Sequence, residues 1–399
     1  MAENMVIKSK LKHRMGTLVI RTIPGAKVTV NQMAHEFSFG TAISRRIFTD
    51  QFSPENREKY LAVLKENFNS VVHENAMKWY STEKKQGELT YHSADEMLKW
   101  CTDNGLQTRG HCVYWAKDEF VQSWIKDLDN QALRDALEAR AINFTKHYRG
   151  QIIEFDVNNE MLQGDFYARR LGEPIRKEMF LWCQKVNPDA ILYVNDYGIL
   201  TGGALAQYEK QIESLLAQGA PIGGIGLQGH FGKSVSKDKV KGVLDSLSRF
   251  KLPIKITEFD MKTLDENAKA KGLENLYRSG FEHPSVDGIL MWGFWAECHW
   301  LSSKKWGIDG YTALWDKDWN QMPAARVYRD LVFKEWWTNY SGTADKQGLC
   351  KVQVFLGRHK VTVPDAELIV ELTKSESRKE VNLRAQPGAA LDGAKTHRK

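Results

Sequence analysis

Glu160 and Glu258 are the residues whose type and position best suit catalysis. Each lies at or near the end of a short apolar run that is typical of a buried strand, Ile152–Glu160 in one case and Pro253–Asp260 in the other. Hydrolysis of a glycosidic bond requires two carboxyl groups flanking that bond, one protonated and the other ionised. We therefore treat the two glutamates as a candidate pair for this chemistry.

The neighbouring residues indicate which glutamate takes which role. His230 and Asp260 could hydrogen-bond around Glu258 and hold it ionised, as a nucleophile must be. Glu160 follows two asparagines, which add no charge and leave a buried carboxyl free to keep its proton. We assign Glu160 as acid/base and Glu258 as nucleophile.

Other ionisable and amide side chains also end the predicted strands. A strand end needs one or two polar capping groups, and any one of these residues alone could be structural. Because they recur on six consecutive strands, we expect them to converge on one site. They are His73, Glu74, Asn75, His111, Asn159, Asn195, Asp196, Tyr197, Gln228, His230 and Asp260.

Tryptophan is the second signal. The chain has 13, and eight of them lie between Trp292 and Trp337. Indole faces suit the apolar faces of sugar rings, and the indole N–H can still find a hydrogen-bond partner. We expect Trp292 and Trp300 to contact a ligand.

A metal site is the main rival interpretation, because histidines and acids at strand ends could bind a divalent ion. However, Phe37–Ala42 offers no His-x-His pair, and no His-Glu-x-x-His occurs. Gly223–Gly226 lacks the Lys-Ser/Thr that follows a phosphate-binding loop, so we interpret these glycines as close strand packing. We expect no metal and no cofactor.

The elements that must position these residues alternate between apolar, β-rich runs and amphipathic helical segments such as Asp129–Tyr148 and Leu205–Ala217. Alternating βα units predict a parallel sheet, and eight of them in succession favour a (β/α)8 TIM barrel, whose active site lies at the carboxyl ends of its strands. The eight runs are Phe37–Ala42, Ser70–Glu74, Thr108–Tyr114, Ile152–Glu160, Ala190–Asp196, Gly223–His230, Pro253–Asp260 and Asp287–Trp295.

The flanks of the barrel predict a small β satellite. Thr17–Thr22 and Lys27–Gln32 alternate around residues 23–26 and predict a hairpin. Three short strands, Lys351–Phe355, His359–Val363 and Leu368–Leu372, complete the satellite. The expected organisation is a hairpin flank at 12–36, a barrel at 37–340, a β extension packing with that flank at 341–374 and a loose tail at 375–399.

Composition narrows the class of protein. The 399 residues are 42% hydrophobic and 27% charged, with a net charge of +6. This profile is typical of a globular chain without a nucleic-acid footprint, and no apolar stretch reaches the ~18 residues of a membrane span. The five cysteines, Cys101, Cys112, Cys183, Cys298 and Cys350, show no zinc-site spacing, so we expect most of them to be buried hydrophobes.

No signal-peptide core is present, so either the protein is intracellular or its leader is absent from this chain. We expect a secreted monomer that lacks its leader, and a cytoplasmic protein stays an open alternative.

The motifs that carry this chemistry resemble those of glycoside hydrolase family 10, the endo-1,4-β-xylanases, from about Lys12 to about Leu372. Phe155–Glu160 is similar to the family's acid/base strand and Ile256–Asp260 to its nucleophile strand. Three further segments resemble the sugar-binding strands and the strand around the nucleophile: Glu74–Trp79, Gly110–Trp115 and Gly226–His230. The strand 8 segment Gly293–Glu297 resembles plant-like members of the family.

The resemblance implies a retaining mechanism on xylan or xylo-oligosaccharides, with Asn159 bonding the sugar 2-hydroxyl, and Gln228 and His230 surrounding the nucleophile. It places Tyr197 on the aglycone side and the following residues on the glycone side: Glu74, Asn75, Lys78, His111, Trp115, Trp292 and Trp300.

Three alternatives stay open beside this interpretation. The same chemistry could act on other β-glycans, or transfer the sugar to a second sugar. A non-catalytic carbohydrate-binding barrel is the alternative outside enzyme chemistry.

Overall fold

The computed structural model describes residues 10–302 and 313–384, which form two compact units. One unit comprises Ser38–Leu331. The other combines the two ends of the chain, up to Phe37 and from Val332. Residues 332–340, which we expected in the barrel, therefore belong with the chain ends.

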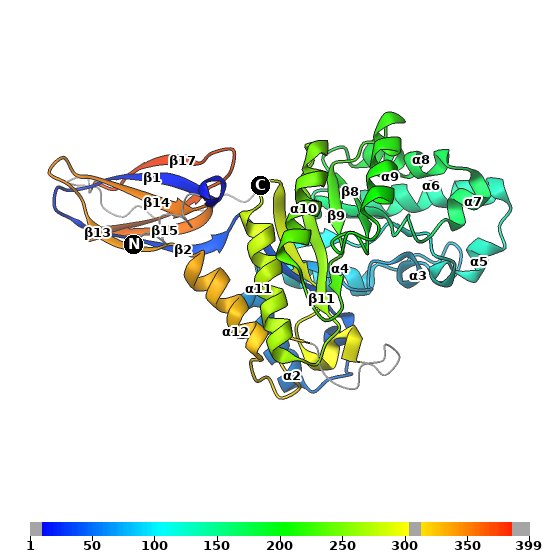
Figure 1. The fold of residues 1–399 in the computed structure, drawn as a ribbon, viewed down its shortest axis with the longest axis horizontal. Coiled ribbons are helices and arrows are strands. Elements are labelled where there is room, and N and C mark those ends of the chain that lie inside the picture. Colours follow the sequence, from blue (N-terminus) through cyan, green and yellow to red (C-terminus); the bar gives the residue numbers. More distant parts are fainter. Residues whose placement is uncertain (1–9, 303–312, 385–399) are drawn as a thin grey trace. The chain divides into compact units, whose positions relative to one another are not determined.

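The larger unit is a closed (β/α)8 barrel of parallel strands surrounded by helices, as predicted (Figure 1). The barrel closes where the last strand pairs with the first, with Gly288 opposite Ser38 and Met291 opposite Thr41. In order around the barrel, the strands are β3 (Ser38–Ile43), β4 (Ser70–His73), β5 (Gln107–Gly110), β7 (Glu154–Asn159), β8 (Ile191–Asp196), β9 (Gly224–Leu227), β11 (Ile254–Met261) and β12 (Val286–Met291). Two short strands, β6 (Tyr114–Trp115) and β10 (His230–Phe231), extend β5 and β9.

Helices of the larger unit lie on the outside of the strands (Figure 1). They are α2 (Pro54–Asn67), α3 (Trp79–Thr82), α4 (His92–Asp103), α5 (Ser123–Lys126), α6 (Asn130–His147), α7 (Phe166–Leu171), α8 (Pro174–Val186), α9 (Leu205–Ala217), α10 (Lys237–Leu247), α11 (Glu266–Glu282) and α12 (Pro323–Asp330). Helix α9 has the predicted bounds, and it buries Tyr208, Ile212 and Leu215 of its apolar stripe. Helix α6 starts after Asp129, whose Oδ1 accepts a hydrogen bond from Ala132 N at 2.8 Å.

Every residue of β3 and of β11 is buried, because barrel strands are covered on both faces. Strand β3 is mostly apolar, whereas β11 also buries Lys255, Thr257, Glu258 and Asp260. The glycines of β9 allow close packing, as predicted. A Cβ on Gly224 would collide with the Tyr193 ring, and one on Gly226 would lie 2.6 Å from Asn195 Oδ1.

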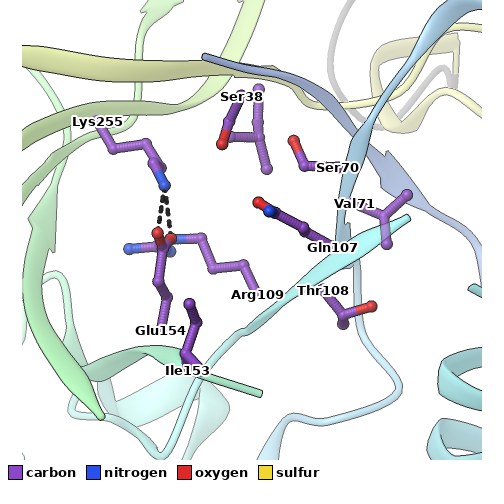
Figure 2. A pocket seen from close by; sticks show the side chains of 10 residues that line it. Ser38, Ser70, Val71, Gln107, Thr108, Arg109, Ile153, Glu154 and Lys255 are labelled. Atoms are coloured by element: carbon purple, nitrogen blue, oxygen red, sulfur yellow. Dashed lines mark hydrogen bonds and ion pairs between the residues drawn. The ribbon is translucent and has the colours of Figure 1, made fainter. Parts of the chain in front are cut away.

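An ionic cluster lies in the barrel interior near the amino ends of the strands, beside a cavity of about 20 Å³ (Figure 2). Lys255 Nζ lies 2.5 Å from Glu154 Oε1 and 3.7 Å from Asp287 Oδ1. Arg109 Nε lies 3.5 Å from the other oxygen of Glu154. Lys255 and Arg109 are each 3% exposed, so these charges depend on one another rather than on water.

The smaller unit contains two sheets around an apolar core that includes Leu18, Ile20, Val30, Val354 and Val361. One sheet has the order β14-β1-β17 and the other β13-β2-β15-β16. The strands are β1 (Met15–Arg21), β2 (Lys27–His35), β13 (Asn339–Thr343), β14 (Leu349–Phe355), β15 (Gly357–Val363), β16 (Ala366–Leu372) and β17 (Arg378–Asn382).

The predicted hairpin is wrong. Strand β1 pairs with β14 and β17, whereas β2 pairs with β13 and β15, so the turn at residues 23–26 connects the two sheets. Alternation shows which face of a strand is buried, but it does not identify the partner strand.

The expected loose tail also needs correction, because residues 378–382 form β17 beside β1. That strand is mostly polar and buries Val381, so its sequence resembles a coil. The rest of the tail, 385–399, lies outside the described residues.

All five cysteines are buried and free. No described helix combines the length and the apolar character of a membrane span.

Candidate active site

A cleft of about 520 Å³ opens at the carboxyl ends of the barrel strands. Strand ends from β4 to β12 contribute to it, as the fold predicts. Its lining residues are Glu74, Asn75, Lys78, Tyr80, His111, Trp115, Lys117, Glu119, Phe120, Asn159, Glu160, Tyr197, Gln228, His230, Glu258, Trp292 and Trp300.

Glu160 directly follows β7 and has a φ of 60°, in the left-handed region that side chains other than glycine rarely adopt. Three donors hold its carboxyl group. Trp115 Nε1 donates to Oε2 at 3.0 Å, and Gln228 Nε2 and Asn159 Nδ2 donate to Oε1 at 2.9 and 3.3 Å. Strained backbone fixed by surrounding contacts is typical of functional sites.

Glu258 lies within β11 and is 4% exposed. Asn195 Nδ2 donates to its Oε1 at 2.8 Å, and His230 Nε2 lies 3.3 Å from its Oε2. Burial by itself would raise the pKa of the Glu258 carboxyl, but the hydrogen bond from His230 and the charges of His111 and His230 together outweigh it, and the pKa falls below its ordinary value. The side chain is therefore ionised at neutral pH.

His230 is fixed between two carboxylates, since its Nδ1 lies 2.9 Å from Asp260 Oδ1. Burial lowers the pKa of a histidine, but Asp260 and Glu258 together raise the pKa of His230 to about 10. At neutral pH both ring nitrogens therefore donate, one to each acid. Trp300 Nε1 donates to Asp260 Oδ2 at 2.6 Å and so ties the tryptophan to this group.

Asn195 connects the surroundings of the two glutamates. Its Nδ2 donates both to Glu258 Oε1 and to Asn159 Oδ1, the latter at 3.0 Å. Thr257 Oγ1 donates to Asn195 Oδ1 at 2.7 Å, which fixes the orientation of the amide. Glu160 and Glu258 thus face one cleft through a single hydrogen-bonded network, from strands separated by β8 and β9.

One extra residue interrupts the ladder in both strands that carry the glutamates. Between Asp156 and Asn159, β7 has two residues against one of β8, and between Ile256 and Phe259, β11 has two against one of β12. A bulge of this kind redirects the side chains that follow it. Glu258 lies in the β11 bulge.

A second buried group orients His111. Its Nδ1 lies 2.8 Å from Asp156 Oδ2, and Arg109 forms a bidentate pair with the same carboxylate. Burial alone would raise the pKa of Asp156, but Arg109 and His111 lower it below its ordinary value. The ring of His111 meets that of Trp292 edge to face, with 5.1 Å between the centroids.

Cationic and aromatic groups face each other where the segment after β4 meets Trp115 of β6 and Trp292, which follows β12. Lys78 Nζ lies 4.4 Å from the Trp115 ring centroid and 5.8 Å from that of Trp292, and it donates to Asn75 Oδ1 at 3.1 Å. Burial raises the pKa of Glu74, although Lys78 opposes the shift. This wall offers donors, acceptors and apolar faces together, as a sugar ring requires.

The family model of glycosyl hydrolase family 10 matches residues 29–331, which include the whole barrel. The chain belongs to this family. Among curated relatives of this family 10 chain, endo-1,4-beta-xylanase 1 of Arabidopsis thaliana is 41% identical over 275 residues, covering 68% of the chain and 28% of the relative. An anti-sigma-I factor of Acetivibrio thermocellus is 38% identical over 343 residues, covering 86% of the chain and 43% of the relative. The chain thus spans less than half the length of these relatives.

Solved family 10 structures share the fold. Xylanase 10B from Thermotoga petrophila, solved in complex with xylobiose, matches with a TM-score of 0.68 at 24% identity, over 75% of this chain and 95% of that one. The native xylanase 10B from Thermotoga maritima matches equally well, with a TM-score of 0.68 at 23% identity over 75% of this chain and 96% of that one.

The structure brings the predicted site residues of this family 10 chain together. Most of them line the cleft. Asp260 and Asn195 lie behind the lining and bond to His230 and to Glu258. His73 and Asp196 were also expected at the site, but they bond to backbone groups instead, His73 to the Ala94 carbonyl and Asp196 to the N–H groups of Leu162 and Tyr197. The described residues hold no group of three or more metal-ligating side chains arranged for a metal ion.

Sequence reasoning missed four lining residues: Tyr80, Lys117, Glu119 and Phe120. Lys117 immediately precedes the short 3-10 helix Asp118–Phe120, and Glu119 and Phe120 lie in it; three residues are too few to show a periodicity. The one available signal was their closeness in sequence to a predicted strand end.

Proposed function

We propose that this chain is an endo-1,4-β-xylanase that cleaves internal bonds of xylan by retaining double displacement. The observation that carries the proposal is that Glu160 and Glu258 face one cleft, joined through Asn195 and Asn159 and held by different partners. The names of the Arabidopsis thaliana relatives, endo-1,4-beta-xylanases 1 and 3, support the substrate class.

In the first step, Glu258 attacks the anomeric carbon while Glu160 gives its proton to the departing glycosidic oxygen. Glu258 suits this step because His230 and Asn195 keep it ionised and aimed into the cleft. The bond to the leaving sugar breaks as the Glu258–carbon ester forms.

In the second step, Glu160, now ionised, removes a proton from water, which displaces Glu258 from the anomeric carbon. The product keeps the β-configuration because the carbon is inverted twice. Asn159 is positioned to bond the 2-hydroxyl next to the scissile bond. The tryptophan and Lys78 wall takes the glycone sugars, and Tyr197 takes the aglycone side.

Reducing-sugar release from xylan, compared with release from a soluble cellulose, tests the activity. We expect release from xylan by the unchanged protein and a loss of at least about 10³-fold in Glu258→Ala. Proton NMR of the first products distinguishes retention, which gives the β-anomer, from inversion. Equal activity of Glu258→Ala and the unchanged protein, or an α-anomer as first product, would refute the mechanism.

A second candidate function is that of a sugar-sensing module, favoured by the relative named an anti-sigma-I factor, of which this chain matches 43%. A sensor needs the cleft but not turnover. A thermal shift with xylohexaose and no product after prolonged incubation would support it over hydrolysis.

A further inference from the structure

Lys117 is a charged side chain in the cleft that the mechanism above does not use. Its Nζ lies 3.6 Å from Oε2 of Glu160 and 3.4 Å from Oε1 of Glu119. It also lies 5.6 Å from the ring centroid of Tyr197, so it borders the aglycone side. The side chain is 22% exposed, which leaves the ammonium only partly screened by water.

The charges around Glu160 come from several elements of the barrel. On the negative side, Glu119 lies in η3 (Asp118–Phe120), Asp196 ends β8 and Glu258 lies in β11. On the positive side are Lys117 and, beyond Gln228, the His230 of β10. Tyr197 is neutral, because burial raises the pKa of its phenol.

Among these groups, Lys117 is the cation in direct contact with the Glu160 carboxyl. The other groups that touch this carboxyl, Trp115, Gln228 and Asn159, are neutral donors. Asp196 lies nearby, and burial raises its pKa to about 7 although the backbone N–H groups of Leu162 and Tyr197 hold its two carboxylate oxygens, so it adds negative charge only as the pH rises through that value. Lys117 therefore supplies the positive charge in contact with the Glu160 carboxyl.

We propose that Lys117 is a positioning residue that sets the pH above which Glu160 loses its catalytic proton. The proposal rests on the proposed role of Glu160 as acid/base. A nearby cation favours the ionised carboxylate, so Lys117 moves the basic limb of the activity profile toward lower pH. Glu119 shares the same ammonium and reduces this effect.

Three variants separate the charge of Lys117 from its bulk. Lys117→Met removes the cation, and the basic limb of kcat/KM on xylohexaose should move up by about 0.5 pH unit, the shift expected for one partly exposed ion pair. Lys117→Arg should return the limb to the position in the unchanged protein. Glu119→Gln removes the second carboxylate that pairs with Lys117, so the ammonium acts on Glu160 alone and the basic limb should move to lower pH.

Lys241→Met, on the exposed face of α10, is the matched control and should leave the profile unchanged. An aryl xylobioside with a dinitrophenol leaving group needs no leaving-group protonation, so the limb assigned to Glu160 should be absent from its profile in the unchanged protein. Thermal melts of each variant at one pH show whether the fold is kept.

In one outcome, the basic limb of the unchanged protein is present on xylohexaose and absent on the aryl xylobioside, but Lys117→Met does not move the limb on xylohexaose. The role of Lys117 is then refuted, and that of Glu160 stands. If the two substrates give the same limb in the unchanged protein, the acid/base role of Glu160 fails, and this proposal fails with it.

Discussion

Replacing Lys255 by methionine should destabilise the barrel strongly without touching the cleft. Lys255 is 3% exposed, and its Nζ contacts both oxygens of Glu154, at 2.5 and 2.7 Å (Figure 2). Methionine fills much of the same space but leaves Glu154 with Arg109, 3.5 Å away, as its remaining cation. The ionic cluster would then hold an under-compensated buried carboxylate.

Removing one partner of a buried ion pair costs about 3–5 kcal/mol. Glu154 keeps Arg109, and its side chain is 16% exposed, so we expect the lower end, about 3 kcal/mol. For a barrel of about 300 residues the unfolding entropy is about 0.6 kcal/mol/K, so the midpoint of thermal unfolding should fall by about 5 °C. Urea unfolding followed by tryptophan fluorescence measures the free energy directly.

The double variant Lys255→Met with Glu154→Gln is the matched control, because it also removes the charge of Glu154, the carboxylate nearest to Lys255 Nζ. Asp287, 3.7 Å from Lys255 Nζ and 27% exposed, keeps its charge in both variants. The double variant should recover all but about 1 kcal/mol. In both variants kcat/KM below the unfolding transition should stay unchanged, because the cluster lies at the amino ends of the strands. A single variant as stable as the unchanged protein, or a double variant no better than the single, would refute the reasoning.

Three further predictions concern the site and its pH dependence. Asn195→Ala removes the hydrogen bonds to Glu258 and Asn159, and because a hydrogen bond to a charged group is worth about 1.5–3 kcal/mol, kcat/KM on xylohexaose should fall about 10- to 100-fold. A variant with full activity would show that this network does not position the two glutamates. Burial lowers the pKa of His73 from 6.5 to about 4, so as the pH drops from about 6.5 to 4 the imidazole takes up a proton in the unfolded chain but not in the folded one, and the free energy of unfolding falls. In urea titrations at pH 7 and pH 5, His73→Gln should therefore lose less stability between the two pH values than the unchanged protein, and an equal loss would contradict this. Prolonged incubation with a chelator should leave xylan hydrolysis unchanged, and lost activity restored by a divalent cation would contradict a mechanism carried by two carboxyl groups.

The barrel could be predicted from the sequence because its signal is local and repeated. A strand buried on both faces, such as β9, appears as a continuous apolar run, and helices such as α9 carry a periodic apolar stripe. The site followed from the same reasoning, since a parallel barrel brings all its strand ends to one rim. Asp260 and His230 were therefore found beside Glu258 without any coordinates.

The smaller unit could not be predicted in the same way, because its pairing is not local. Strand β1 pairs with β14 and β17, more than 300 positions away along the chain, and no short-range pattern encodes that choice. Strand β17 has one buried apolar residue, Val381, so its extended form depends on β1 rather than on its own sequence. Tertiary context decides such segments.

The direction in which the two glutamate side chains point could not be predicted from the sequence either, because it depends on the bulges of β7 and β11. In a regular strand, side chains alternate between the two faces of the sheet up to the last residue. One extra residue reverses the face to which every later side chain points. The extra residue of β11 lies at 257–258 and includes Glu258, and that of β7 lies at 157–158, two residues before Glu160, which adopts a left-handed conformation. The strand ladder is thus broken at the two places where a side chain must leave the wall and point into the cleft. Residue types at strand ends indicate that such a site exists, whereas the bulges, which no periodicity indicates, accompany the turn of Glu160 and Glu258 into the same cleft.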